Sequence, residues 1–232
     1  MTPAPHVART LLLSLAVLAL DFGLLALGVG GLGPLAHHAR ALALFASWVV
    51  ATPTLALLRP VRSHEPVSAQ SDPLVMLALF AIPLLTPMLS ALGERLGLWL
   101  LPGGAPLRWG GVGLSVAGLA LRIAAMRQLG SRFSPVAAVQ RDHALETGGL
   151  YGVLRHPGYL GACACELGIV LAFGSALTLP LALVMGLALG RRIAFEERLL
   201  EERFGGEFLA YRARVGGFLP RVGTARAPRG RA

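Results

Sequence analysis

Long apolar runs separated by short polar segments dominate the hydrophobic pattern of this sequence. A helix needs about 20 consecutive apolar residues to cross the hydrocarbon core of a bilayer. The runs that approach this length cover residues 11–30, 41–58, 74–93, 106–129, 158–173 and 176–190. The pattern therefore predicts an all-α, polytopic membrane protein with about six transmembrane helices.

The last two runs are joined only by Gly174 and Ser175, which predicts a tight antiparallel helical hairpin. The final run is about 15 residues long, roughly 22 Å of helix, and falls short of the hydrocarbon thickness of about 30 Å. We therefore expect the helix to continue and to place Arg191, Arg192 and Glu196 at the membrane boundary or just above it. Residues 155–159 lead into the fifth run from the same side, so the two polar clusters should face one another.

The distribution of arginine predicts the orientation. With the N-terminus in the cytoplasm, the outer segments hold only Arg40, Arg95 and Arg108, and the inner segments and the C-terminal tail hold most of the others. The positive-inside rule then places both termini in the cytoplasm. The first run resembles a signal peptide, but no polar mature domain follows it, so we expect an uncleaved first helix. Residues 98–104 are predicted to form a loop at the interface.

Composition supports a membrane protein and disfavours nucleic-acid binding. Only 14% of the residues are charged, against roughly 25% in soluble domains. The net charge of +9 comes from arginines that flank apolar runs, and aromatic residues make up only 6%. Cys163 and Cys165 point in different directions on a helix, so we expect two buried packing cysteines and no metal site.

The charged residues of the last helix have a simple structural interpretation. Arg192 and Glu196 are four residues apart and would form a surface pair worth a few tenths of a kcal/mol. Glu197 with Glu201, and Arg198 with Glu202, are predicted to form a mostly solvated face. In the same way, His156 before Pro157 fits the first turn of a helix, where the missing N–H of proline has no cost.

Taken together, the motifs from Gly130 onward indicate a functional site, which no single motif does. In order and spacing they resemble the isoprenylcysteine carboxyl methyltransferase family, whose relatives include membrane methyltransferases acting on phospholipid amines. The resemblance covers roughly the last 90 residues, and the first four runs match only in being apolar. The matching elements are Gly130-Ser131-x-Phe133, Asp142-His143-x-Leu145, Thr147-Gly148-Gly149-x-Tyr151, Arg155-His156-Pro157-Gly158-Tyr159-x-Gly161, Arg192-x3-Glu196-Glu197, Phe204-Gly205-x-Glu207-Phe208-x2-Tyr211-x3-Val215 and Leu219-Pro220.

The resemblance implies a methyltransferase that uses S-adenosylmethionine without a Rossmann domain. By position it implies cofactor contacts from three stretches and one acid: His143, Ala144, Leu145 and Glu146; Tyr151; His156, Pro157, Gly158 and Tyr159; and Glu196. Arg192 matches an arginine that contacts the substrate, so Arg192 and Glu196 are the candidate catalytic pair. The chain departs from the family at Gly149-Leu150-Tyr151-Gly152, where members often read Gly-Pro-Tyr-Arg.

The residue types suit methyl transfer to several acceptors. A carboxylate nucleophile is already ionised at neutral pH and needs no general base, and Arg192 would orient it through a charge-assisted fork. An amine or thiol would first lose a proton, and Glu196 or His156 could then act as the base. Two carboxyl groups also lie inside apolar runs, Glu166 and Asp21, and such groups are functional candidates. Glu166 lies two turns beyond Tyr159 on one helix face and could bind substrate.

The sequence thus predicts membrane helices over residues 1–129, a methyltransferase region over residues 130–220 and a disordered basic tail over residues 221–232, in a bacterial inner membrane. The expected partners are membrane lipids and a lipophilic or prenylated acceptor, with no nucleic acid. A membrane reductase of the sterol type, with a nicotinamide cofactor, remains an alternative, as do a phospholipid or thiol methyltransferase and a non-catalytic relic of the scaffold.

Overall fold

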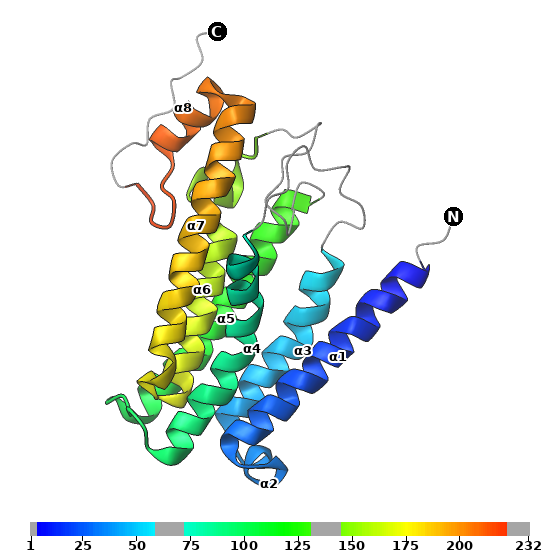
Figure 1. Cartoon of the computed structure of the whole chain (residues 1–232), viewed down its shortest axis with the longest axis vertical. Coiled ribbons are helices and arrows are strands. Elements are labelled where there is room, and N and C mark those ends of the chain that lie inside the picture. The colour runs from blue at the N-terminus through cyan, green and yellow to red at the C-terminus, as the bar shows by residue number, and fades with distance from the viewer. Residues whose placement is uncertain (1–3, 59–71, 131–144, 222–232) are drawn as a thin grey trace.

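The computed structural model describes residues 4–58, 72–130 and 145–221, and most of these residues lie in helices. The helices are α1 (Ala4–Val29), α2 (Leu32–Ala36), α3 (Ala39–Leu57), α4 (Pro73–Leu96), α5 (Gly104–Leu129), α6 (Pro157–Phe173), α7 (Leu179–Phe204) and α8 (Gly206–Arg214), with 3₁₀ turns η2 (Gly149–Gly152) and η3 (Ala176–Thr178). Figure 1 shows the long helices side by side as one bundle.

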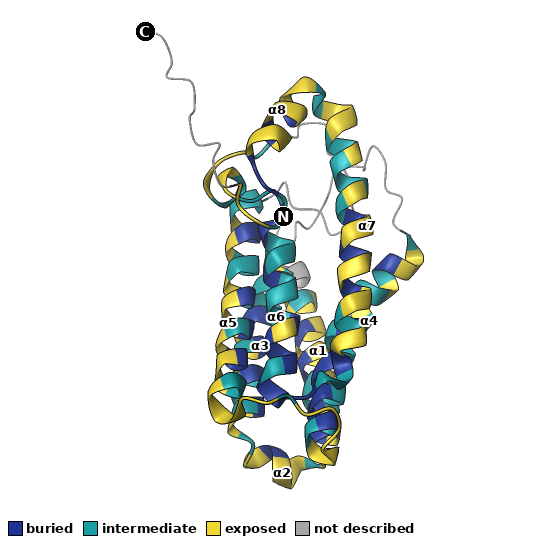
Figure 2. Ribbon diagram, turned by 90° about the vertical axis from the view of Figure 1, so that its left-hand side faces the viewer, coloured by how far each residue is buried: buried dark blue, intermediate teal, exposed yellow. Residues whose placement is uncertain are grey.

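Within the described residues, five helical segments are long and apolar enough to cross a membrane: they contain α1, α3, α4, α5 and α7. The predicted fifth span is α6, a shorter apolar helix of 17 residues. Large aliphatic side chains such as Leu12, Leu183 and Leu187 are exposed on the outside of the bundle, and Figure 2 shows exposed residues along its outer faces. The chain is therefore an all-α, polytopic membrane protein.

Helices α5 and α6 pack closely because glycines line their contact. A Cβ atom on Gly118 would lie 2.5 Å from the Gly161 carbonyl oxygen, and one on Gly161 would lie 2.6 Å from that of Gly118. Gly111 and Gly168 meet neighbouring backbone in the same way. Small residues at this spacing let membrane helices approach closely. Helix α5 therefore holds the first turns of α6 in place.

A polar cluster joins four helices at the end of the bundle near α2. Glu94 of α4 accepts hydrogen bonds from Arg40 of α3 and Arg108 of α5, both at 2.7 Å. His38 contacts the other carboxylate oxygen at 3.3 Å, and Arg40 also donates to the Ala172 carbonyl of α6. Two of the three arginines that the sequence placed on the outer side are thus held by one carboxylate.

The connection between α6 and α7 is as short as the sequence predicts. Gly174 ends α6 in a left-handed conformation with φ 62°, and the Ser175 hydroxyl caps η3, which leads directly into α7. The predicted interface loop packs on this turn, since Leu101 N–H donates to the Gly174 carbonyl. Helix α7 then continues unbroken to Phe204, as expected from its short apolar run. Its far end, α8 and the start of α6 gather at one end of the bundle (Figure 1).

Candidate functional site

The segment before α6 is fixed by the chain that follows α8. Leu154 and Gly216 form an isolated parallel bridge. The backbone N–H groups of Arg155 and His156 donate to the carbonyls of Gly216 and Gly217 at 2.8 and 3.3 Å. Pro157 then occupies the first turn of α6, where its ring suits the helix and its missing N–H costs nothing. These contacts set the direction in which His156 and Tyr159 project.

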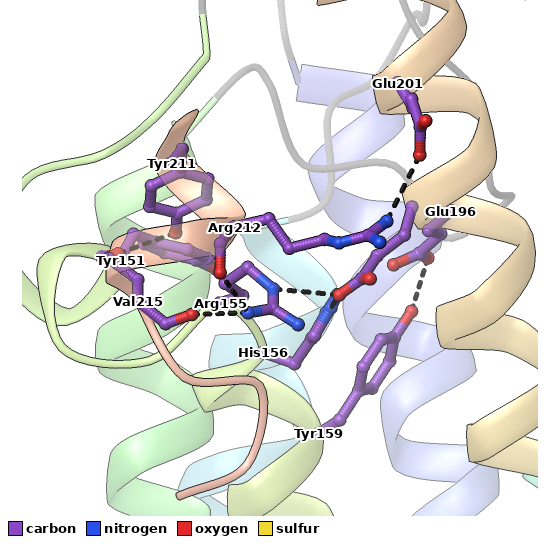
Figure 3. Close-up of polar contacts among 10 residues, drawn as sticks. Tyr151, Arg155, His156, Tyr159, Glu196, Glu201, Tyr211, Arg212 and Val215 are labelled. Carbon is purple, nitrogen blue, oxygen red and sulfur yellow. Dashed lines mark hydrogen bonds and ion pairs between the residues drawn. The ribbon is translucent and has the colours of Figure 1, made fainter. Parts of the chain in front are cut away.

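Tyr159 of α6 joins Arg192 and Glu196 of α7. Its hydroxyl donates to Glu196 Oε1 at 2.5 Å and accepts from Arg192 Nε at 2.5 Å, and Figure 3 shows the Tyr159–Glu196 contact between the two helices. Arg192 also pairs with Glu196 Oε1 at 3.2 Å and lies 5.9 Å from the Tyr159 ring centroid. The Arg192 side chain is only 7% exposed, so the pair is not a solvated surface contact.

A second carboxylate, Glu197, neutralises the start of α6. Glu197 Oε1 accepts from Arg155 Nε and contacts His156 Nε2, both at 2.9 Å. The Glu197 side chain is 16% exposed, so its assignment to a solvated face was wrong. Arg155 also donates to the Val215 carbonyl, and the His156 ring stacks on Tyr159 with centroids 5.8 Å apart. Figure 3 shows Arg155 between Val215, which follows α8, and helix α7.

Tyr151 forms a wall of the same region. Its hydroxyl donates to the Ala125 carbonyl at 3.4 Å, and its own carbonyl accepts from the Tyr211 hydroxyl at 2.6 Å. Burial, followed by the nearby Glu196 carboxylate, raises the pKa of Tyr151 well above its ordinary value. Burial also raises the pKa of Tyr211 to about 12. Both phenols therefore stay protonated at neutral pH and act as hydrogen-bond donors.

Part of the first predicted stretch is described by the structure. Leu145 packs against Phe208 and Tyr211 beneath α8. Glu146 Oε1 accepts from Gly148 N–H at 3.1 Å and from Gln128 Nε2 at 3.3 Å. His143 and Ala144 lie outside the described residues.

The structure thus brings most of the predicted residues to one end of the bundle. Glu166 is an exception, because it lies two helical turns deeper on α6 and is 5% exposed. Asp21 is on α1, which packs against α2, α3 and α4.

Three residues at this end were missed by the sequence reasoning. Glu197 binds the start of α6, Gln128 holds the 146–150 turn through Gly148 and Leu150, and Tyr211 fixes Tyr151. Tyr211 and Glu197 are part of the motifs that match the family, so the resemblance could have identified them as candidates. Gln128 stood outside every motif that was compared.

Comparison with known proteins supports a relationship for this part of the chain. Residues 111–202 match the isoprenylcysteine carboxyl methyltransferase (ICMT) family model. A protein-S-isoprenylcysteine O-methyltransferase of Schizosaccharomyces pombe is 36% identical over 114 residues, which are 48% of this chain and 48% of the relative.

Two further relatives carry the same activity in their names. Protein-S-isoprenylcysteine O-methyltransferase B of Arabidopsis thaliana is 30% identical over 115 residues, 48% of this chain and 58% of the relative. The enzyme of Saccharomyces cerevisiae is 33% identical over 110 residues, 46% of each chain. The matches therefore span about half the length of these relatives.

Proposed function

We propose that this chain, whose residues 111–202 belong to the isoprenylcysteine carboxyl methyltransferase family, is a membrane methyltransferase that uses S-adenosylmethionine. One observation carries the proposal: the start of α6 and the extension of α7 meet at Tyr159, Arg192 and Glu196. The acceptor is a lipophilic molecule with a carboxylate, of the isoprenylcysteine kind. The reaction site lies where the bundle leaves the hydrocarbon.

The residues present fit S-adenosylmethionine, which supplies a methyl group activated by a sulfonium. Glu196 uses Oε1 for both Tyr159 and Arg192, so its second oxygen is placed to bind a cationic group. The rings of Tyr151, His156 and Tyr159 provide the flat surfaces that an adenine requires. Leu145, Glu146, Pro157 and Gly158 complete this proposed surface, and His143 and Ala144 join it by the resemblance.

Arg192 is proposed to hold the acceptor carboxylate. Its Nη1 donates to the Met76 sulfur at 3.4 Å, and a thioether is a weak acceptor for a guanidinium. A carboxylate would form a stronger, charge-assisted bond at the same side chain. Because the acceptor is already ionised at neutral pH, Arg192 needs only to orient it. Met76 lies in the first turns of α4, so the acceptor would enter between α4 and α7.

The neighbouring charges position these groups. Glu197 pairs with Arg155 and contacts His156, which leaves Glu196 as the carboxylate that Arg192 and Tyr159 aim at the ligand. In this proposal the bundle spans a bacterial inner membrane, and its arginine-rich end and both termini face the cytoplasm. This orientation gives the site access to a water-soluble methyl donor.

The test is methyl transfer to a farnesylthio carboxylic acid by the purified protein in detergent. We expect the Arg192→Ala and Glu196→Ala variants to lose at least about 100-fold in kcat/KM, because each removes a charged contact in a partly dehydrated site. Arg191→Ala is the matched control, since Arg191 is 73% exposed and pairs with Asp72. Full activity in both site variants would exclude the assigned roles.

A further inference from the structure

Glu166 is a buried carboxyl group that the proposed methyl transfer does not use. It lies on α6 within the bundle and is 5% exposed. Thr86 of α4 is its polar neighbour, and the Thr86 hydroxyl donates to the Ile82 carbonyl of its own helix at 2.9 Å. Among the described residues its Oε2 atom is buried without a hydrogen-bond partner. Buried polar atoms are almost always paired, because an unpaired one keeps its full desolvation cost. Such an oxygen points to a missing partner.

Glu166 lies on the face of α6 that leads inward from the site. Tyr159, Cys163 and Glu166 are spaced four and three residues apart, so they share one side of the helix. Tyr159 and Cys163 pack with Ile82 of α4 and with Met185 and Leu189 of α7.

Helix α4 follows the same path. Its Met76 contacts Arg192 at the site, Ile82 meets the apolar cluster, and Thr86 meets Glu166. The face between α4, α6 and α7 therefore runs from Arg192 to Glu166, and an acceptor held by Arg192 would lay its apolar body along it. Seven residues separate Tyr159 from Glu166, which is about 10 Å along the helix axis.

We infer that Glu166 determines acceptor specificity by accepting a hydrogen bond from a hydroxyl or N–H group on the apolar body of the acceptor. The inference rests on the proposed function, since Arg192 must hold the other end of the same molecule. The preferred acceptor is then a lipid with a donor group about 10 Å from its methylated end. A plain polyprenyl chain fits the apolar residues but leaves Glu166 Oε2 unpaired.

The test compares two acceptors that differ in one group. The first is a farnesylthio carboxylic acid, and the second is the same acid with a hydroxyl on the chain about 10 Å from the carboxylate. We expect the wild-type protein to prefer the hydroxylated acid by about tenfold in kcat/KM, the usual effect of one buried hydrogen bond. Glu166→Leu should lose this preference, which is measured as the ratio of the two kcat/KM values. Glu166→Gln keeps an acceptor oxygen and should retain part of the preference.

Asp21→Leu is the matched control, because it removes a carboxyl from an apolar helix that lies elsewhere in the bundle. It should leave the preference unchanged. A wild-type protein that treats the two acids alike, or a Glu166→Leu variant that keeps the tenfold preference, would overturn the inference.

The dissociation constants of both acids, measured by thermophoresis, separate this inference from the proposed activity. If no methyl is transferred but Glu166→Leu still abolishes a preference in binding, the acceptor inference stands and the proposed reaction falls. If methyl transfer occurs without any preference in either measurement, the reaction stands and the role of Glu166 falls. Glu166→Gln provides the same comparison should the leucine variant fail to fold.

Discussion

The hydroxyl of Tyr159 donates to Glu196 Oε1 at 2.5 Å, across the space between α6 and α7. The same oxygen of Tyr159 accepts from Arg192 Nε, so one phenol orders a carboxylate and a guanidinium. Helix α7 alone would hold Arg192 and Glu196 only as an i,i+4 contact. The tyrosine makes their geometry depend on the position of α6.

Replacing Tyr159 with phenylalanine tests this link. The ring would still stack on His156, and only the hydroxyl would be lost. We expect kcat/KM for methyl transfer to fall about 10- to 100-fold, because hydrogen bonds to charged groups contribute about 1.5–3 kcal/mol. Steady-state kinetics with a farnesylthio acid measure the change. Activity within twofold of the wild type would show that the hydroxyl does not order the pair.

Glu197→Ala should loosen the start of α6. The substitution leaves Arg155 and His156 without their shared carboxylate, and we expect a loss of roughly 2 kcal/mol in stability together with weaker methyl-donor binding. Glu201→Ala is the control, because Glu201 forms an exposed pair with Arg212 that should contribute less than about 1 kcal/mol. Thermal unfolding in detergent compares the two. Equal losses of stability in both variants would contradict the role of Glu197 in holding the start of α6.

The α5–α6 contact predicts a strong dependence on glycine. At Gly118 or Gly161 an added Cβ would lie within 2.6 Å of backbone oxygen, so alanine should lower stability by at least about 1–3 kcal/mol. At Gly113 an added Cβ meets nothing within 4 Å, and alanine there should be neutral or stabilising. Melting temperatures of the purified variants decide the matter, and a neutral Gly118→Ala would show that the helices are less closely packed.

Tyr211 predicts a loss of stability at high pH. Its pKa is raised by burial to about 12, against about 10 for a free tyrosine. Because the pKa of Tyr211 is higher in the folded protein than in the unfolded chain, the protonated phenol stabilises the fold. This contribution to the free energy of unfolding is complete below about pH 10 and is lost as the pH rises through about 12. The wild type should therefore lose more stability between pH 9 and 11.5 (roughly the range set by these values) than Tyr211→Phe. Parallel curves for the two proteins would contradict this.

The sequence predicted the helices well because a helix that crosses a membrane needs a long run of apolar residues, and such a run is visible in the sequence. The expected run 158–173 became α6, Pro157–Phe173, and the run 74–93 became α4, Pro73–Leu96. The short helix α2 was not predicted, since Leu32–Ala36 is too short to show a period.

The site was predictable only in part. Tyr159, Arg192 and Glu196 followed from motif spacing and from the need for α7 to continue beyond the membrane. The role of Glu197 depends on Arg155 and His156, which lie more than 40 residues away in sequence, and local spacing made it look like a solvated residue. Gln128 at the end of α5 meets the 146–150 turn only through tertiary packing. Pairings of this kind are set by the fold rather than by any local pattern.

The most direct measurement of the central claim is calorimetric titration of the purified protein with S-adenosylmethionine, its demethylated product and NADPH. We predict binding of the first two, loss of that binding in Glu196→Ala and no loss in the neighbouring Arg191→Ala. Preferred binding of NADPH, or no heat with any of the three, would contradict the account.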